Sequence, residues 1–374
     1  MARSRGTDDG SPSVVVVGPL PPPIHGAARV TAHMVEQLRQ AGAQVVAVDT
    51  SGAADAGPLR YHLARIRSHA AAARVAWRER HRAASYYIAG AGGLGLWYQA
   101  VLVLIARAVG HRVVFHHHSY TYLVQANVAV RLMVRSGGRR MEHVALCNGM
   151  ARTLKDRYPA VRSVHVCSNA WLYDPLDSPA PRPGAEDGIV LGHLGNLSEE
   201  KGLSDVFATL RRLRSDGVPV RLLLGGPVGD ADAGQQLEAA RAEFGEAVEH
   251  LGPIRPDDVE AFYRRVDVFV FPSRNEAEPL VVLEASRCGV PTVAFSIGCM
   301  PSLVPDADWL VNLAGDFPEA AARVVRRLRD AEDREACRQS VLGHFAHRHQ
   351  VAGAAQRRLR DDLQTPRAPA AAAC

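Results

Sequence analysis

Short apolar runs alternate along the first half of the chain with segments of helical periodicity. Near-continuous apolar, β-branched runs are typical of parallel strands that are covered on both faces. Residues 28–42, between the first two runs, place apolar side chains at helical spacing and end at Gly42. This alternation predicts a doubly wound α/β sheet. We expect its strands at residues 14–18, 45–49, 85–90, 113–117, 143–147 and 163–167.

A segment rich in Pro, Asp and Gly interrupts the pattern at residues 172–188. The pattern then restarts, with expected strands at 189–195, 221–226, 268–273 and 291–295 and expected helices at 203–216, 234–244, 257–265 and 279–288. The chain of 374 residues is also too long for one ordinary domain. We therefore expect a disordered N-terminus at 1–12, a Rossmann-like domain at 13–175, a linker at 176–188, a second such domain at 189–340, a helix at 341–363 that crosses back to the first domain, and a disordered tail at 364–374.

The two halves of the chain carry charge of opposite sign, although the net charge is only +5. Residues 1–175 contain 21 Lys and Arg against 9 Asp and Glu, and the remainder contains 23 against 30. This asymmetry indicates two domains with different partners. No secretory signal and no apolar run of about 20 residues is found, so we expect a cytoplasmic protein.

Residues 59–82 form an amphipathic, basic segment whose only acid is Glu79. Such a helix can lie on the anionic inner face of a membrane, or it can be a core helix with a solvated basic face. Both interpretations stay open at this point. No recognition motif accompanies the charge, so a nucleic-acid partner is not expected.

Two strand–turn–helix segments in the second half carry the chemistry. Gly195 to Gly202, with the sequence GNLSEEKG, follows an expected strand, and Lys201 and a helix N-terminus there suit a diphosphate. Residues 271–285 follow another strand and contain Glu276 in the turn and Glu284 on the helix. Carboxylates in this position accept hydrogen bonds from sugar and ribose hydroxyls. Alone, each segment could equally be a solvated turn or a capped helix.

Together, and followed by CGVPTVA, these segments resemble the donor domain of the family 4 retaining glycosyltransferases, which have the GT-B fold. The resemblance implies that Lys201 holds the donor diphosphate, that Glu276 bonds the transferred sugar and that Glu284 binds the ribose. Glu276 and Lys201 would be catalytic, together with His118. The donor pocket would also include Gly26, Gly195, Asn196, Gly225, Gly226, Ile254, Arg274, Pro279 and Leu280.

The sequence departs from the family pattern at two places. Asn196 stands where the phosphate loop usually has arginine, so Lys201 carries more of the charge, with Arg274 as a candidate helper. Ser302 stands where an acidic residue is common, which leaves the donor's sugar open.

The first half agrees with the family more loosely. The proline-stiffened loop 18–28 follows the first strand, and it lacks the glycine fingerprint of dinucleotide-binding enzymes. The histidines at 116–118 follow the fourth strand, where the family has a histidine, and His118 matches best. Because neighbouring strand residues point to opposite faces, at most His116 and His118 could share a metal, and no third ligand is evident. The acceptor side would comprise Pro23, His25, Gly26, His116 and Ser119.

These observations predict a retaining, metal-independent glycosyltransferase. Its co-substrate would be a UDP- or GDP-linked hexose, with no metal and no other cofactor. Its acceptor would be a small molecule or a lipid-linked sugar in polysaccharide, glycolipid or natural-product biosynthesis. Two alternatives remain: a nucleotide-sugar 2-epimerase-like isomerase, and a non-catalytic sugar-binding relative.

Overall fold

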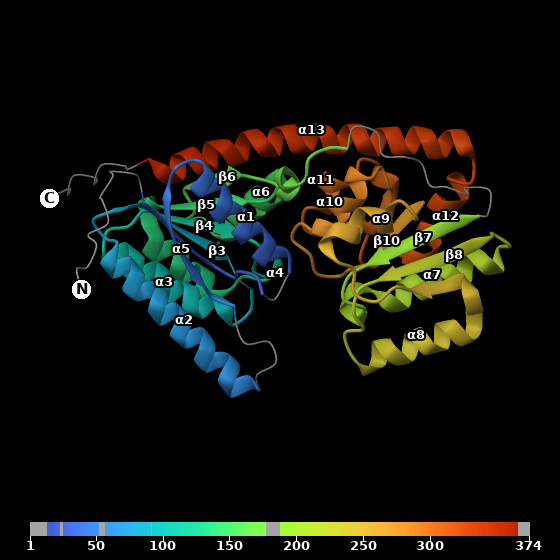
Figure 1. The fold of residues 1–374 in the computed structure, drawn as a ribbon, viewed down its shortest axis with the longest axis horizontal. Coiled ribbons are helices and arrows are strands. Elements are labelled where there is room, and N and C mark those ends of the chain that lie inside the picture. The colour runs from blue at the N-terminus through green and yellow to red at the C-terminus, as the bar shows by residue number, and fades with distance from the viewer. Residues whose placement is uncertain (1–12, 23–24, 52–56, 91, 177–187, 366–374) are drawn as a thin grey trace, which may run out of the picture. The chain divides into compact units, whose positions relative to one another are not determined.

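The computed structural model describes residues 13–22, 25–51, 57–90, 92–176 and 188–365. It divides into two compact units (Figure 1): unit 1 comprises Met1–Leu172 and Gly353–Cys374, and unit 2 comprises Tyr173–Ala352. The expected disordered N-terminus, most of the expected linker and nearly all of the expected tail lie outside the described residues.

Unit 1 is built on a six-stranded parallel sheet with the strand order β2-β1-β3-β4-β5-β6. The first connection runs to one side of β1 and the later ones run to the other side, which is the doubly wound arrangement. The strands are β1 (Ser13–Gly18), β2 (Gln44–Asp49), β3 (Ala83–Gly90), β4 (Val113–His117), β5 (Met141–Ala145) and β6 (Ser163–Val166).

Helices cover both faces of this sheet. On one face α1 and the end of α13 pack on Val14, Val16 and Tyr87 through Met34, Leu38, Leu359 and Leu363. On the other, α2, α3 and α5 lie side by side (Figure 1). The helices of unit 1 are α1 (Gly26–Gln40), α2 (Pro58–Arg78), α3 (Gly95–Ala108), α4 (Thr121–Val124), α5 (Val128–Gly137) and α6 (Asn148–Arg157), with short turns η1 (Gly138–Arg140) and η2 (Asn169–Leu172).

Unit 2 contains a second six-stranded parallel sheet, with the order β12-β11-β10-β7-β8-β9. Its strands are β7 (Ile189–Leu194), β8 (Val220–Gly225), β9 (Val248–His250), β10 (Val268–Phe271), β11 (Thr292–Phe295) and β12 (Leu310–Val311). Its helices are α7 (Leu203–Ser215), α8 (Ala231–Phe244), α9 (Val259–Tyr263), α10 (Leu280–Arg287), α11 (Met300–Leu303) and α12 (Phe317–Arg327), with turns η4 (Glu199–Lys201), η5 (Gly245–Ala247), η6 (Pro256–Asp258) and η7 (Ala307–Trp309).

The last helix, α13 (Ala331–Gln364), belongs to both units: it lies in unit 2 as far as Ala352 and in unit 1 from Gly353. It begins at Ala331, earlier than the expected start at 341. The Asp330 carboxylate accepts hydrogen bonds from the backbone N–H groups of Glu332 and Asp333 and so caps the earlier start. No helix among the described residues is long and apolar enough to cross a bilayer.

Candidate functional site

In the parallel sheet of unit 2, the order in which strands are added changes direction between β7 and β10. These two strands are neighbours, with Val268 opposite Leu191, yet β8 lies beyond β7 and β11 lies beyond β10. Ligands of open parallel sheets bind outside the carboxyl ends of the strands at such a switch point. The loop that carries Lys201 follows β7, and the loop that carries Glu276 follows β10. The topology therefore brings both expected donor-site segments to one edge.

Lys201 and Glu276 meet at this edge. The Lys201 Nζ donates to Glu276 Oε1 at 2.6 Å, and the Ser273 hydroxyl donates to the same oxygen at 3.0 Å. Both charged side chains keep some exposure, 28% and 15%. Because an ammonium group has three N–H donors, Lys201 can hold Glu276 and still donate to a ligand.

Gly202 explains how the two loops approach so closely. It has a left-handed φ of +78°, and a Cβ placed there would collide with the backbone oxygen of Pro272. The left-handed turn also ends η4 and starts α7. A glycine is therefore required directly after Lys201.

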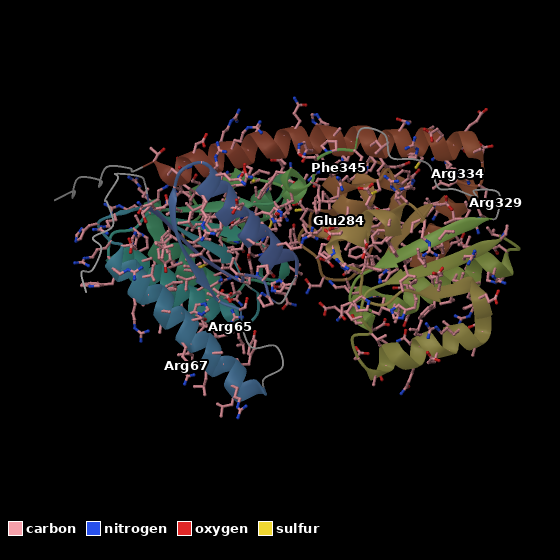
Figure 2. The ribbon with its side chains drawn as sticks, in the orientation of Figure 1. Arg65, Arg67, Glu284, Arg329, Arg334 and Phe345 are labelled. Carbon is pink, nitrogen blue, oxygen red and sulfur yellow. The ribbon has the colours of Figure 1, made fainter. Side chains whose placement is uncertain are left out.

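Glu284 is buried on α10, the helix that follows the turn of Glu276; Figure 2 labels it. Its Oε1 accepts a hydrogen bond of 2.7 Å from the Tyr173 hydroxyl. Pro279 is the N-cap residue of α10, and Leu280 is the first residue of the helix. The sequence pattern did not indicate Tyr173, because it lies 111 positions from Glu284 at the edge of the expected linker.

The ends of β7 and β8 form the next part of the edge. Gly195 N–H donates to Gly225 at 3.1 Å, and Gly226 N–H donates to the Gly252 carbonyl at 2.7 Å. Gly226 has φ +115°, and a Cβ there would collide with the Gly195 carbonyl oxygen. Ile254 packs against Gly225. Four expected donor-site residues are thus close to one another.

Asn196 and Arg274 lie at the same end of unit 2 but differ in their surroundings. Asn196 is exposed in the loop after β7. The Arg274 guanidinium is held by the Asp205 carboxylate at 2.8 Å and lies over the Phe295 ring. Its positive charge is therefore already balanced by a carboxylate in the first turn of α7.

The three histidines at the end of β4 separate onto opposite sides, as alternation along a strand predicts. The rings of His116 and His118 lie 4.2 Å apart, and His116 Nδ1 hydrogen-bonds the Tyr87 hydroxyl at 2.6 Å. On the other side His117 stacks on His143 and hydrogen-bonds it at 3.0 Å. No group of three side chains able to hold a metal occurs in the described ranges.

Burial keeps these imidazoles neutral. It lowers the pKa of His118 to about 4 and the pKa of His143 to about 4, and it lowers the pKa values of His116 and His117 well below the ordinary value of 6.5. The His118 Nε2 is buried and has no hydrogen-bond partner among the described residues. His118 therefore offers a neutral imidazole nitrogen at the carboxyl end of the unit 1 sheet.

The remaining acceptor-side residues lie near the carboxyl ends of β1 and β4. His25 caps α1, because its Nδ1 accepts from Ala28 N–H at 3.3 Å, and Gly26 is the first residue of that helix. Ser119 hydrogen-bonds Thr121 at 2.9 Å. Pro23 lies outside the described residues.

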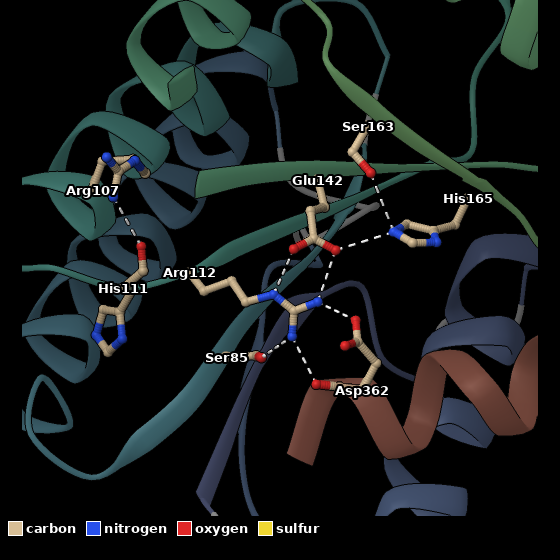
Figure 3. Close-up of polar contacts among 8 residues, drawn as sticks. All are labelled: Ser85, Arg107, His111, Arg112, Glu142, Ser163, His165 and Asp362. Atoms are coloured by element: carbon tan, nitrogen blue, oxygen red, sulfur yellow. Dashed lines mark hydrogen bonds and ion pairs between the residues drawn. The ribbon is translucent and has the colours of Figure 1, made fainter. Parts of the chain in front are cut away.

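A second polar cluster lies near the opposite, amino-terminal end of the unit 1 sheet (Figure 3). The Arg112 guanidinium donates to both carboxylate oxygens of Glu142 at 2.8 Å, to the Asp362 backbone oxygen at 2.7 Å and to the Asp362 carboxylate. His165 also contacts Glu142, at 3.1 Å. This cluster ties the end of α13 to β4 and β5, so its role is structural.

The sequence pattern of the family described as glycosyl transferases group 1 matches residues 178–341. That region contains Lys201, Glu276 and Glu284. Residues 178–341 belong to the group 1 glycosyl transferases. This confirms the resemblance on which the donor-site roles depend.

Curated relatives are similar to part of the chain. A D-inositol 3-phosphate glycosyltransferase from Corynebacterium urealyticum is 32% identical over 167 residues, 43% of this chain and 38% of the relative. The enzyme of that name from Salinispora arenicola is 37% identical over 152 residues, 38% of this chain and 34% of the relative. The aligned part is thus well under half the length of each of these relatives.

Solved structures match nearly the whole chain. HepE from Anabaena, in complex with UDP and glucose, has a TM-score of 0.64 at 17% identity and covers 94% of this chain and 99% of its own. Sucrose-phosphate synthase from Thermosynechococcus elongatus has a TM-score of 0.68 at 16% identity, with 94% and 98% covered. Together with the two parallel sheets, these matches confirm the GT-B fold.

One contact of the turn that carries Glu276 could not be predicted from the sequence. The buried Glu278 carboxylate accepts from Arg348 on α13 at 3.0 Å, and Arg348 also donates to the Ser302 carbonyl at 2.6 Å. Glu278 therefore fixes the loop of Glu276 to α13. The sequence alone does not reveal this structural role of Glu278, because it lies only two positions from Glu276.

Proposed function

We propose that the chain transfers a hexose from a nucleotide diphosphate sugar to an acceptor, with retention of configuration and without a metal ion. The observation that carries the proposal is the contact between Lys201 and Glu276 at the switch point of unit 2. An ammonium for phosphate and a carboxylate for hydroxyls lie side by side where parallel sheets bind ligands.

In this proposal the residues of unit 2 bind and orient the donor. Lys201 donates to the diphosphate and stabilises the charge that develops on it as the glycosidic bond breaks. Glu276 accepts from hydroxyls of the sugar, and Glu284, oriented by Tyr173, accepts from the ribose. The leaving phosphate oxygen takes the acceptor proton, so no separate side-chain base is required. Unit 1 holds the acceptor, with His118 as a neutral hydrogen-bonding group.

The donor and acceptor are proposed from the relatives. UDP-glucose is the first donor to test, because HepE was solved with UDP and glucose. D-inositol 3-phosphate is the first acceptor to test, because two relatives of the chain are named D-inositol 3-phosphate glycosyltransferases. We propose that the reaction takes place in the cytoplasm, with residues 59–82 of unit 1 in contact with the membrane.

The test is incubation with UDP- and GDP-hexoses in excess chelator, with release of nucleotide diphosphate as the measured quantity. Acceptor-dependent release and a product with the donor's anomeric configuration by NMR support the proposal. Conversion of the nucleotide sugar to its 2-epimer would identify an isomerase instead. Binding of UDP without turnover, with every acceptor, would identify a non-catalytic relative. Activity that chelator abolishes and magnesium restores would overturn metal independence.

A further inference from the structure

The helices α2, α3 and α5 of unit 1 present apolar side chains on the sides turned away from the sheet. They are packed together: the His62 ring of α2 hydrogen-bonds Tyr98 of α3 at 3.1 Å, and Arg107 of α3 donates to the Gly137 carbonyl at the end of α5 at 2.8 Å. Their outer sides therefore form one continuous surface, here called the outer helical face. Its exposed apolar members are Leu59, Leu63, Ile66, Trp77, Leu94, Trp97, Val101, Leu104, Val128 and Leu132.

α3 is apolar on both sides. Its inner side is buried through Leu96, Leu102 and Val103, and its outer side carries Trp97, Val101 and Leu104 at a spacing of three to four residues. Trp97 is 46% exposed and Val101 is 54% exposed. A surface helix of a globular protein normally has a polar outer side, so this stripe indicates contact with an apolar phase.

α2 supplies charge directly beside its apolar stripe. Its buried residues are His69, Ala72 and Ala76, and Leu59, Leu63, Ile66 and Trp77 form an exposed stripe along one flank of that buried side. Arg60, Arg67, Arg74 and Arg78 recur at a spacing of seven and four residues, so they form a second outward stripe next to the apolar one. Arg67 projects from α2, as Figure 2 shows. On α5, Arg131 and Arg135 flank Leu132 in the same way.

Acidic residues are nearly absent from this part of the sequence. Residues 51–140 contain 13 arginines and only two acids, Asp55 and Glu79. Asp55 lies outside the described residues, and Glu79 is buried and accepts from Arg78 at 2.9 Å. The outer helical face therefore combines exposed apolar and aromatic side chains with positive charge alone.

We propose that the outer helical face docks on an anionic lipid bilayer. The apolar stripes and Trp77 and Trp97 would enter the headgroup region, and the arginines would pair with anionic headgroups. A second copy of the chain is the poorer occupant, since a symmetric interface would bring the arginine stripes of both copies together. This surface extends beyond residues 59–82 to α3 and α5, and it does not depend on the donor site.

The test is co-sedimentation of the full chain with vesicles of phosphatidylcholine alone or with added phosphatidylglycerol. We expect binding only with phosphatidylglycerol, weakened by salt. The charge variant Arg67→Glu/Arg74→Glu and the apolar variant Trp97→Ser/Leu104→Ser should each bind about tenfold more weakly. Matched controls in unit 2, Arg221→Glu/Arg329→Glu and Leu313→Ser/Val351→Ser, should bind like the wild type, because they change exposed residues that do not belong to the outer helical face.

Equal binding to both vesicles, no binding to either, or equal losses in the control variants would overturn the proposal. A wild-type dimer in light scattering that the apolar variant makes monomeric, without vesicle binding, would assign the face to a second copy. A thermal-shift measurement with UDP reports separately on the donor site of every variant. A chain that binds anionic vesicles but releases no nucleotide from any donor would keep this inference and overturn the proposed function.

Discussion

Lys201 and Glu276 are 75 positions apart in the sequence and share a hydrogen bond of 2.6 Å in the structure. Each has a polar partner already, so neither is a stray surface charge. Lys201 can donate to a phosphate in two ways. Its contact with Glu276 can loosen, or another of its three N–H groups can make the new hydrogen bond. In the proposed function, the side chain that binds phosphate is therefore hydrogen-bonded to the side chain that binds sugar hydroxyls.

We expect Lys201→Ala and Glu276→Ala each to lower kcat/KM by about 10²- to 10³-fold, because each removes a contact that strengthens in the transition state. Steady-state kinetics with the productive donor and acceptor measures this. Arg221→Ala, an exposed residue of β8, is the matched control and should leave kcat/KM unchanged. Values for both site variants within threefold of wild type would reject the donor-site assignment.

His118 belongs to unit 1, whereas all the proposed donor contacts except Gly26 belong to unit 2. We therefore expect His118→Ala to lower kcat while the affinity for the nucleotide sugar stays unchanged. Calorimetric donor affinity and single-turnover rates separate these quantities. His165→Ala, a partly exposed histidine at the other end of the sheet, is the control. A donor that binds tenfold more weakly to the His118 variant, yet reacts at the wild-type rate once bound, would contradict this division of roles.

At the scale of elements, the last turns of α13 are held to the sheet of unit 1 by the buried guanidinium of Arg112. Arg112 is 7% exposed and Glu142 is 6% exposed, and Asp362 completes the cluster from the last turns of α13. Removing one member of a buried ion pair leaves an uncompensated charge, which costs more than the pair itself contributes. Replacing Arg112 should therefore lower the free energy of unfolding strongly. Replacing Asp362, which is 29% exposed, should lower it much less.

We expect Arg112→Leu to lower the free energy of unfolding by about 3–5 kcal/mol, because the buried Glu142 carboxylate loses the guanidinium that pairs with both of its oxygens. Asp362→Asn should cost only about 1 kcal/mol, since its side chain is partly in water. Urea unfolding followed by circular dichroism measures both. Arg358→Leu, at an exposed position of α13, should change stability by less than about 0.5 kcal/mol. Equal effects of Arg112→Leu and Arg358→Leu on the free energy of unfolding would show that the Arg112 cluster does not stabilise the fold.

The sequence pattern located most elements but not the pairings between them. Long apolar runs such as Val14–Val17 are unambiguous, whereas β9 and β12 were missed, since strands this short have no period of their own. The two donor-site turns were located by their position after strands. The partners of Glu284, Glu278 and Arg112 could not be predicted, because Tyr173, Arg348 and Asp362 lie 111, 70 and 250 positions away.

At the scale of the whole molecule, the two units share buried histidines. The sheet of unit 1 buries a chain of imidazoles from β4 and β5, and unit 2 buries His193 beside the Phe269 and Phe271 rings. Burial lowers the pKa of His193 to about 4, although its Nδ1 donates to the Val270 carbonyl at 2.9 Å. Both cores are therefore built around neutral histidines.

These histidines predict how stability depends on pH. His118, His143 and His193 have folded pKa values of about 4, below the ordinary value of 6.5 that applies when the chain unfolds. Between these values the unfolded chain binds more protons than the folded chain, so acid favours unfolding. We expect the free energy of unfolding to fall between pH 6.5 and pH 5 by about 1.4 kcal/mol per pH unit for each such histidine.

Urea unfolding at pH 7, 6 and 5 measures this slope in a range where most carboxylates stay ionised. His193→Gln replaces a buried imidazole by an amide that takes up no proton, so the slope should become shallower by about 1.4 kcal/mol per pH unit even if the variant is less stable overall. Leu313→Ser, at an exposed position of unit 2, removes no titratable group and should leave the slope unchanged. A free energy of unfolding that stays constant from pH 7 to pH 5 would mean that the buried rings accept protons without cost. The neutral imidazole assigned to His118 would then be wrong as well, because it rests on the same burial.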